Sequence, residues 1–501
     1  MIKRAIVLTD TTENYENDTA SFFQNLRNLG TLEVRARLRR NGWSVESLEF
    51  ATIWQDMPNT KFFSIIDMIF KNADESILAI SSAIIRNLPY SLEPTLKYVR
   101  ECYPKTKIIL GGIRAVEKHE EEFFSKYFDS IFIGRSMEMF EEYLQNNDMS
   151  KYCTIKNKPW YTNTSINYDI EKPLVCDLID DDDFITEHDV LGIELGLGCK
   201  FNCSFCNYPL RNAKKIYLSS EDALAQAMQS AYDRYGVTNF YVADDTSNET
   251  DEKLNILVNA VDKLSFVPNL GGFARLDVLA NRPHQLELFK KINFQSFVFG
   301  VETFNPEASK LIRKKHSSHS VEDVLTKIKK EMPHAWVSIS LIIGLEKDDP
   351  VELMNICKYL VDKKLVHMIS AGPLDLKDES IFLVNEDSIL SSMDSSPKKF
   401  GYTMDKDTIW TSSSMNYKEA KNFYENTFLP WLIENNLNQF LGFTFLNLRS
   451  SGLIGQFESP ESIMDKLKNE SLFNEYRLKI NRLRSAYMKN KFKQIEKKYE
   501  T

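Results

Sequence analysis

The segment "LGLGCKFNCSFCNYPL", residues 195–210, places Cys199, Cys203 and Cys206 within one short loop. The chain of 501 residues has only seven cysteines. The other four stand singly, at Cys102, Cys153, Cys176 and Cys357. An isolated cysteine in a reducing compartment is usually a small buried apolar residue, whereas three thiols at C-x3-C-x2-C spacing indicate a bound metal.

Six repeats of strand and helix surround these cysteines. The predicted strands are residues 190–196, 239–244, 270–275, 296–302, 336–344 and 367–374, separated by amphipathic helical stretches such as "SSEDALAQAMQSAYDRYG". This alternation predicts a parallel sheet that curls into a (β/α)6 partial TIM barrel, with its chemistry at the carboxyl-terminal rim. The cysteines directly follow the first strand, so we expect them on that rim.

Residues 1–147 show a second strand-and-helix series. The predicted strands are residues 4–9, 44–50, 76–81, 107–112 and 130–134. Short apolar strands separated by helices predict a doubly wound, Rossmann-like α/β domain with a parallel sheet covered on both faces. Such sheets bind ligands beyond the carboxyl ends of their strands.

The remaining segments lack this alternation. Residues 148–188 are predicted to be a connector, in which the aspartates at 180–183 form a solvated turn, because the ligand spacing of a calcium-binding EF-hand loop is absent. The core then spans 189–395, and 396–501 form a mainly helical extension. Its last stretch, 471–500, is basic and amphipathic, which favours a solvated helix face over contact with a negatively charged partner.

Composition and charge limit the class of protein. Hydrophobic residues make up 43% of the chain, and the formal net charge is -9 without a long basic run, so no dedicated nucleic-acid surface is expected. Apolar stretches such as "FFSIIDMIF" are too short to span a membrane, and the first residues do not resemble a signal peptide. We therefore expect a cytoplasmic protein.

The three thiols favour an iron–sulfur cluster over zinc. A structural zinc site needs four protein ligands, and neither a fourth cysteine nor a suitably spaced histidine lies nearby. A 4Fe–4S cluster held by three thiolates leaves its fourth iron open to a ligand that is not protein. Such an open iron is a place where chemistry can occur.

With Phe205 just before Cys206, the loop resembles the C-x3-C-x-aromatic-C signature of the radical S-adenosylmethionine (SAM) superfamily. The resemblance implies a 4Fe–4S cluster on Cys199, Cys203 and Cys206, with SAM chelating the open iron through its amino and carboxylate groups. An electron, usually from a flavodoxin or ferredoxin, then cleaves SAM to methionine and a 5'-deoxyadenosyl radical. In such enzymes the cofactor carries the chemistry and the protein orients it.

Polar residues after the next strands align with the same superfamily. "VADDTSN" stands in place of a Gly-Gly-Glu-like segment, so the resemblance makes Asp244 and Asp245 candidates for binding the SAM amino group. It also implies that Arg275, with Asp277, faces the methionine carboxylate and that Glu302 accepts from the ribose hydroxyls. Each has a structural alternative, such as a helix cap for an aspartate or an ion pair for the arginine.

Two further segments are candidates by resemblance. "LIIGLEKDD", residues 341–349, is similar to a fifth-strand segment whose backbone contacts adenine, which implies a role for Ile343 and Gly344, although the glycine could serve only a turn. Lys314 or Lys315 follows a segment that resembles an "L..K" pattern of the same branch.

The first domain resembles the cobalamin-binding fold that precedes the radical core in one branch of the superfamily. "ISSA" occupies the position of a serine after the third strand, and Gly111 and Gly112 supply paired glycines after the fourth. The cobalt-ligating D-x-H-x-x-G motif is absent, and the only histidine of the domain is His119. Members of this branch also bind cobalamin without a histidine ligand, so the sequence leaves cobalamin open.

The reaction class depends on this point. If cobalamin binds, the resemblance implies methylation of an unactivated centre. Without cobalamin, the resemblance implies epimerisation, rearrangement, cyclisation or methylthiolation. Methylthiolation is disfavoured, because it normally involves three further cysteines and only Cys102 lies clearly in the first domain. A non-catalytic iron–sulfur or zinc-binding protein is the alternative from another class. The substrate, a small molecule or a peptide, is not identified by any motif.

Overall fold

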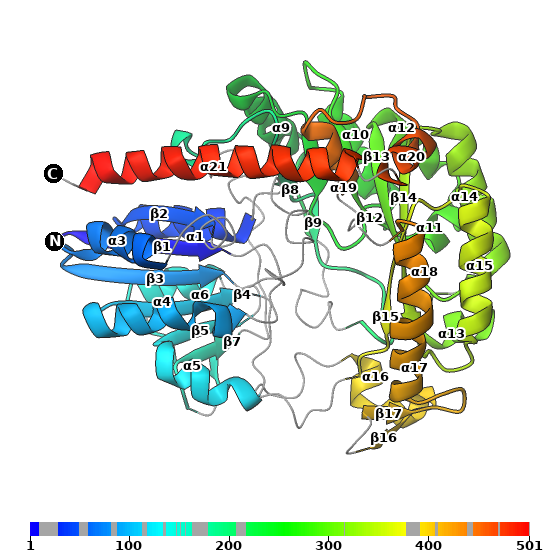
Figure 1. Cartoon of the computed structure of the whole chain (residues 1–501), viewed down its shortest axis with the longest axis horizontal. Coiled ribbons are helices and arrows are strands. Elements are labelled where there is room, and N and C mark those ends of the chain that lie inside the picture. Colours follow the sequence, from blue (N-terminus) through cyan, green and yellow to red (C-terminus); the bar gives the residue numbers. More distant parts are fainter. Residues whose placement is uncertain are drawn as a thin grey trace.

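The structure is a computed structural model of the whole chain (Figure 1). It describes residues 1–9, 29–49, 59–81, 88–112, 118–133, 137–146, 148–150, 152–155, 157–162, 179–206, 217–314, 316–376, 391–405, 409–437, 444–468 and 471–499. The first domain, a barrel-like core and a long C-terminal helix are its three main parts.

The first domain is built on a sheet with strand order β2-β1-β3-β4-β5-β7-β6. Its strands are β1 (Lys3–Thr9), β2 (Ser44–Glu49), β3 (Glu75–Ser81), β4 (Lys107–Gly112), β5 (Ser130–Ile133), β6 (Cys153–Thr154) and β7 (Trp160–Thr162). The five predicted strands are confirmed and pair in parallel. The order 2-1-3-4-5 is that of a doubly wound sheet, whose switch point lies between β1 and β3.

Alternation along each strand divides the domain into two apolar layers. Ile6 and Leu8 of β1 face one layer, and Ala5 and Val7 face the other. The helices are α1 (Leu29–Arg40), α3 (Asn59–Phe70), α4 (Leu88–Cys102), α5 (Glu121–Tyr127) and α6 (Met137–Leu144). Beyond the predicted boundary at residue 147, β7 joins β5 in parallel and β6 joins β7 antiparallel, so the expected connector supplies two further strands, of which β6 forms the edge of the sheet.

The core contains a six-stranded parallel sheet of order β15-β14-β13-β12-β11-β8. Its strands are β8 (Val190–Ile193), β11 (Asn239–Val242), β12 (Asn269–Ala274), β13 (Phe294–Glu302), β14 (Trp336–Ile343) and β15 (Met368–Pro373). All six predicted strands are present. The two end strands are not paired with each other, which gives the partial barrel that the alternation predicts.

The predicted core helices are also present, with two short additions. The helices are α9 (Glu221–Tyr235), α10 (Asp251–Val261), α11 (Leu276–Asn281), α12 (Gln285–Lys291), α13 (Pro306–Leu311), α14 (Ser318–Glu331) and α15 (Pro350–Asp362). Local sequence fixes several of their starts: Ser220, Thr250 and Asp349 accept hydrogen bonds from backbone amides of the first turns of α9, α10 and α15.

The C-terminal extension is not purely helical. A hairpin of β16 (Thr403–Asp405) and β17 (Ile409–Thr411) follows α16 (Ser392–Ser395) and the 3-10 turn η5 (Pro397–Phe400). Helical elements follow: α17 (Tyr417–Phe423), the π-helical turn η6 (Tyr424–Phe428), α18 (Leu429–Glu434), α19 (Thr444–Ser450), α20 (Pro460–Lys468) and α21 (Ser471–Tyr499).

The last helix corrects one prediction. Helix α21 extends from the core across the first domain (Figure 1), and its residues Met488 and Ile495 are buried in an apolar layer of that domain. Lys491 and Lys498 each lie 2.8 Å from the fully buried Glu46 carboxylate of β2. Burial of Glu46 opposes its ionisation, but the two lysines outweigh this effect and lower the pKa. The basic face therefore meets a negative charge within the same chain and is not merely solvated.

The aspartate run corrects a second prediction. Residues 181–183 form the 3-10 turn η3 (Asp181–Asp183), whose Asp183 is buried and accepts from Arg35 Nη2 of α1 at 2.5 Å. Asp180 pairs with Arg39, one turn further along α1, while Asp181 stays exposed. Since α1 presents these two arginines on one face, the run is an ion-paired contact with the first domain rather than a solvated turn.

Candidate active site

The cysteine loop leaves the carboxyl end of the core sheet. A short strand, β9 (Gly196–Leu197), follows β8 closely and pairs antiparallel with β10 (Tyr217–Leu218), and Cys199 comes two residues after it. Cys203 is buried, and Cys199 and Cys206 are half-buried. The loop therefore lies on the rim that the sequence predicts.

Backbone contacts with distant segments hold the loop. The Ser204 amide donates to the Ile312 carbonyl at 3.3 Å, and the Ser204 carbonyl accepts from the Met393 amide at 2.8 Å. The Asn202 carbonyl accepts from Arg313 Nη1 at 3.1 Å. The loop is thus bound to the turn after α13 and to α16, while Phe205 packs, partly buried, against the main apolar core.

The thiols provide the donors that a 4Fe–4S cluster requires. Burial raises the pKa of Cys199, whose Sγ lies 4.0 Å from Thr246 Oγ1. Within the described ranges, no three His, Cys, Asp or Glu side chains gather as a site for one metal ion. Three cysteines of a cubane cluster bind three different irons, so their thiolates need not converge on one point. The donor set therefore fits the cluster.

Arg275 links the end of β12 to this loop. Its Nη1 donates to Cys203 Sγ at 3.0 Å, and its Nε and Nη2 donate to the two Asp277 carboxylate oxygens at 3.0 and 2.7 Å. Its guanidinium lies 3.8 Å from the centre of the Phe201 ring. Burial alone would lower the pKa of Arg275, but Asp277 and Cys203 raise it, so the group stays charged.

The Arg275 backbone is fixed as well. The Asn248 side chain accepts from the Arg275 amide at 2.7 Å and donates to the Arg275 carbonyl at 3.0 Å. Asn248 is fully buried. This reciprocal pair connects the loop between β11 and α10 to the end of β12.

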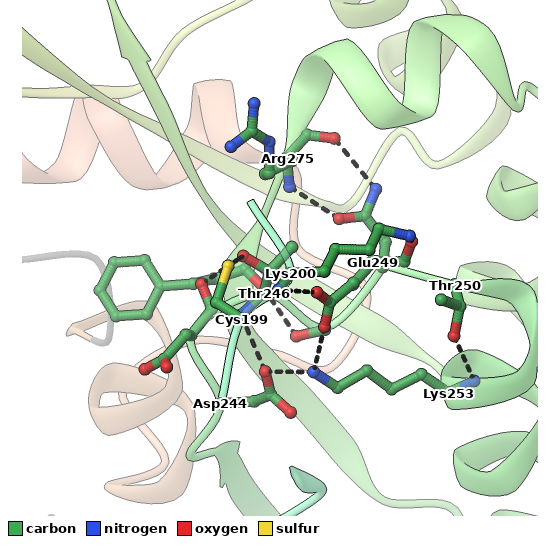
Figure 2. A network of polar contacts seen from close by, with 12 residues as sticks. Cys199, Lys200, Asp244, Thr246, Glu249, Thr250, Lys253 and Arg275 are labelled. Atoms are coloured by element: carbon green, nitrogen blue, oxygen red, sulfur yellow. Dashed lines mark hydrogen bonds and ion pairs between the residues drawn. The ribbon is translucent and has the colours of Figure 1, made fainter. Parts of the chain in front are cut away.

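Asp244 lies in a buried charge network that the sequence analysis did not foresee (Figure 2). Lys253 Nζ lies 2.7 Å from Asp244 Oδ1 and 3.2 Å from Glu249 Oε2, and all three side chains are fully buried. Glu249 Oε1 also accepts from the Lys200 amide at 2.5 Å, directly beside Cys199. The network thereby positions the start of the cysteine loop.

One carboxylate oxygen of this network is left without a hydrogen-bond partner. Burial raises the pKa of Asp244 although Lys253 opposes the shift, and Asp244 Oδ2 is buried without a hydrogen-bond partner. A ligand ammonium would satisfy it. Asp245, next to it, is half-buried. Glu249 and Lys253 were missed, although an acid followed by a lysine four residues later, at the start of a helix, was a visible signal.

Glu302 lies at the carboxyl end of β13 in a strained conformation. Its φ is 68°, and the register with β14 shifts between Gly300 and Glu302. Its Oε1 lies 3.5 Å from Lys314 Nζ, which also donates to the Gly300 carbonyl at 2.7 Å. Burial raises the pKa of Glu302, and Lys314 counteracts this. Lys314 therefore lies beside Glu302, whereas Lys315 lies outside the described residues.

The extension covers the segment after β14. Gly344 has a φ of 96°, and a Cβ there would lie 2.5 Å from the Trp410 ring of β17. The Tyr402 hydroxyl donates to the Gly344 carbonyl at 3.1 Å and accepts from the Glu346 amide at 2.7 Å. The preceding Ile343 is buried. The backbone at Ile343–Gly344 is thus held in one conformation at the rim.

Comparison with known proteins identifies the domain that carries the cysteine loop. The model of the Radical SAM superfamily matches residues 193–359, which contain the cysteine loop, Arg275 and Glu302. The chain therefore contains a radical SAM domain. Its radical SAM domain implies a 4Fe–4S cluster and SAM as cofactors, as the cysteine spacing indicates. No curated protein sequence matches the chain.

Solved structures share the fold across both domains of this chain. The radical SAM methyltransferase TsrM from Kitasatospora setae, with tryptophan and a SAM analogue bound, aligns with a TM-score of 0.52 at 12% identity, covering 74% of this chain and 73% of that one. The cobalamin-dependent SAM radical enzyme OxsB, with aqua-cobalamin and SAM bound, aligns with a TM-score of 0.59 at 14% identity, covering 94% and 72%. At these identities the likeness shows a common fold.

No helix in the described ranges has the length and apolar character needed to cross a membrane.

Proposed function

We propose that this protein reductively cleaves SAM at a 4Fe–4S cluster bound by Cys199, Cys203 and Cys206, forming methionine and a 5'-deoxyadenosyl radical. The cluster supplies the electron for this cleavage. The observation that carries the proposal is the cysteine loop at the carboxyl-terminal rim, with the Arg275 guanidinium 3.0 Å from Cys203 Sγ. That contact puts a positive charge beside a cysteine that would bind the cluster, which supports a role for Arg275 in binding the SAM carboxylate.

The surrounding residues have distinct binding roles in this proposal. Arg275, oriented by Asp277, faces the SAM carboxylate. Asp244 offers its unpartnered Oδ2 to the SAM ammonium, with Asp245 beside it. These roles require an ionised carboxylate at Asp244, and the Lys253 ammonium at 2.7 Å favours that state.

The nucleoside half of SAM is assigned to the later strands. Glu302 accepts from the ribose hydroxyls, and the backbone at Ile343 and Gly344 contacts adenine. The left-handed φ of Glu302 supports a functional role, since a non-glycine residue is held in that region only when its surroundings impose it.

We further propose that cobalamin binds at the first domain and that the reaction is methylation of an unactivated centre. The N-terminus lies on the far side of the first domain, so its parallel strands direct their carboxyl ends toward the core (Figure 1). That edge carries the buried Ser81 at the end of β3 and Gly111 and Gly112 at the end of β4. A ligand at this switch point would lie between the first domain and the SAM site. TsrM and OxsB, which share the fold, are described with cobalamin bound.

The test of SAM cleavage is anaerobic. Iron and sulfide are reconstituted, SAM and dithionite are added, and 5'-deoxyadenosine is quantified in the wild type, in the triple variant C199A/C203A/C206A, and in C357A as a matched control. Cys357 is buried on α15, away from the loop. We expect product in the wild type and C357A alone. Equal product in the triple variant, or none in a wild type that holds about four irons, would refute the proposal and favour a non-catalytic iron–sulfur protein.

The test of cobalamin is spectroscopic. Protein incubated with hydroxocobalamin should keep a cobalamin absorption band after desalting. Loss of the band would remove cobalamin-dependent methylation and favour a radical rearrangement, epimerisation or cyclisation.

A further inference from the structure

A group of exposed cations lies against the cysteine loop. We define the cationic patch as Arg313, Lys398 and Lys399, all exposed. Arg313 follows α13, and its guanidinium donates to the Asn202 carbonyl at 3.1 Å, one residue before Cys203. The same guanidinium lies 5.9 Å from the centre of the Phe400 ring, which adjoins Lys399 in η5.

The patch is built onto the loop rather than onto a mobile surface. The segments that carry its cations meet at Ser204: the amide of this residue donates to Ile312, beside Arg313, and its carbonyl accepts from Met393, four residues before Pro397 of η5. Ser204 is fully buried. The backbone segments that carry the charges are therefore anchored beside the cysteines.

The charge of the patch contrasts with that of the chain. Throughout the described part of the chain, Arg313, Lys398 and Lys399 are not in salt bridges, whereas the whole sequence carries a formal charge of -9. Because the chain as a whole is negatively charged, an acidic partner would be attracted at local positive groups such as this patch, which lies against the cysteine loop.

We propose that the cationic patch docks an acidic protein that carries one electron. This proposal rests on the proposed function, which requires a one-electron reductant. The carrier loses one electron and the cluster gains it, with no proton or group transferred. Such encounters are brief and use small interfaces, roughly below 1,200 Å² in total, in which charged rims set the association rate.

The experiment measures binding apart from turnover. The dissociation constant of a flavodoxin with an acidic surface is determined for the reconstituted wild type, for K398E/K399E, and for K71E/K105E, a control with the same charge change at exposed lysines of the first domain. We expect K398E/K399E to bind about tenfold more weakly at low ionic strength, and the gap to narrow with added salt. The control should bind as the wild type does.

A neutral variant, K398Q/K399Q, controls for misfolding caused by the charge reversal. Its dissociation constant for flavodoxin should lie between those of the wild type and of K398E/K399E. Three results would overturn the proposal: K398E/K399E binds flavodoxin as tightly as the wild type does, the control variant loses as much affinity as K398E/K399E, or the wild type does not bind flavodoxin. Dithionite-driven formation of 5'-deoxyadenosine by the wild type separates the two ideas: if that product is absent, the proposed function fails, whereas the salt-dependent affinity still reports on the patch.

Discussion

Replacing Lys253 with methionine tests the buried charge network beside the cysteine loop. The ammonium lies 2.7 Å from Asp244 and 3.2 Å from Glu249, and none of the three side chains is exposed. Methionine has a similar length, so the main change is the loss of the charge that compensates two buried carboxylates. Removing one partner of a buried ion pair costs about 3–5 kcal/mol. For a domain of this size we expect the midpoint of its thermal transition to fall by roughly 6 °C or more.

The loss of stability caused by removing Lys253 is expected to depend on pH. Burial already raises the pKa of Asp244 above its ordinary value, and without Lys253 the shift grows. A carboxyl group whose pKa is higher in the folded state destabilises the fold at pH values above that pKa, and protonation at lower pH relieves the cost. The loss in K253M should therefore be larger at pH 8 than at pH 5.

Scanning calorimetry compares the midpoints of the thermal transitions of K253M and of a control variant, K263M. Lys263 also contacts two carboxylates, Glu221 and Asp222, but on the surface, so K263M should change little. The triple variant D244N/K253M/E249Q should recover part of the loss. The reasoning would be refuted by equal midpoints in K253M and K263M, or by a larger loss at pH 5.

Three other substitutions probe separate features. Gly344→Ala should lower the midpoint of the core transition in calorimetry, because its Cβ would lie 2.5 Å from the Trp410 ring; unchanged stability would contradict the close approach. Glu46→Gln should weaken the contact of α21 with the first domain by leaving Lys491 buried without its counter-charge, which limited proteolysis of α21 would detect as faster cleavage. Burial lowers the pKa of His367 to about 4 from an ordinary 6.5, so stability should fall as pH drops from 6.5 toward 4, and less steeply in His367→Asn in urea unfolding.

Periodicity was sufficient to predict the six-stranded core sheet and five of the seven strands of the first sheet. The eleven predicted strands are apolar runs of ordinary strand length separated by amphipathic helices, and their identity depends on local pattern alone. The cysteine loop was predictable for the same reason, since its spacing is local and it follows a strand. The hairpin β16–β17 was not, because two strands of three residues carry too little pattern.

Long-range charge pairing could not be read from the sequence. Glu46 and Lys491 are 445 positions apart in the sequence, and the local sequence around each residue does not indicate that the fold buries the two as an ion pair. The same holds for Arg35 and Asp183, so the basic helix and the aspartate run were both expected to be solvated. The same holds inside the site. The sequence predicted Asp244 as a site residue, but its ion pair with Lys253 is visible only in the tertiary structure.

These pairs have a consequence for the proposed chemistry. Arg35–Asp183 and Glu46–Lys491 join the first domain to segments that belong to the rest of the chain, and each is buried. Buried pairs are expensive to break singly, so they hold the two domains in one relative position. Reaction between groups bound to different domains depends on such alignment, since a misplacement of about 1 Å can cost on the order of a hundredfold in rate. In the proposed reaction, these charge contacts far from the cysteines would help to align a ligand of the first domain with the SAM site.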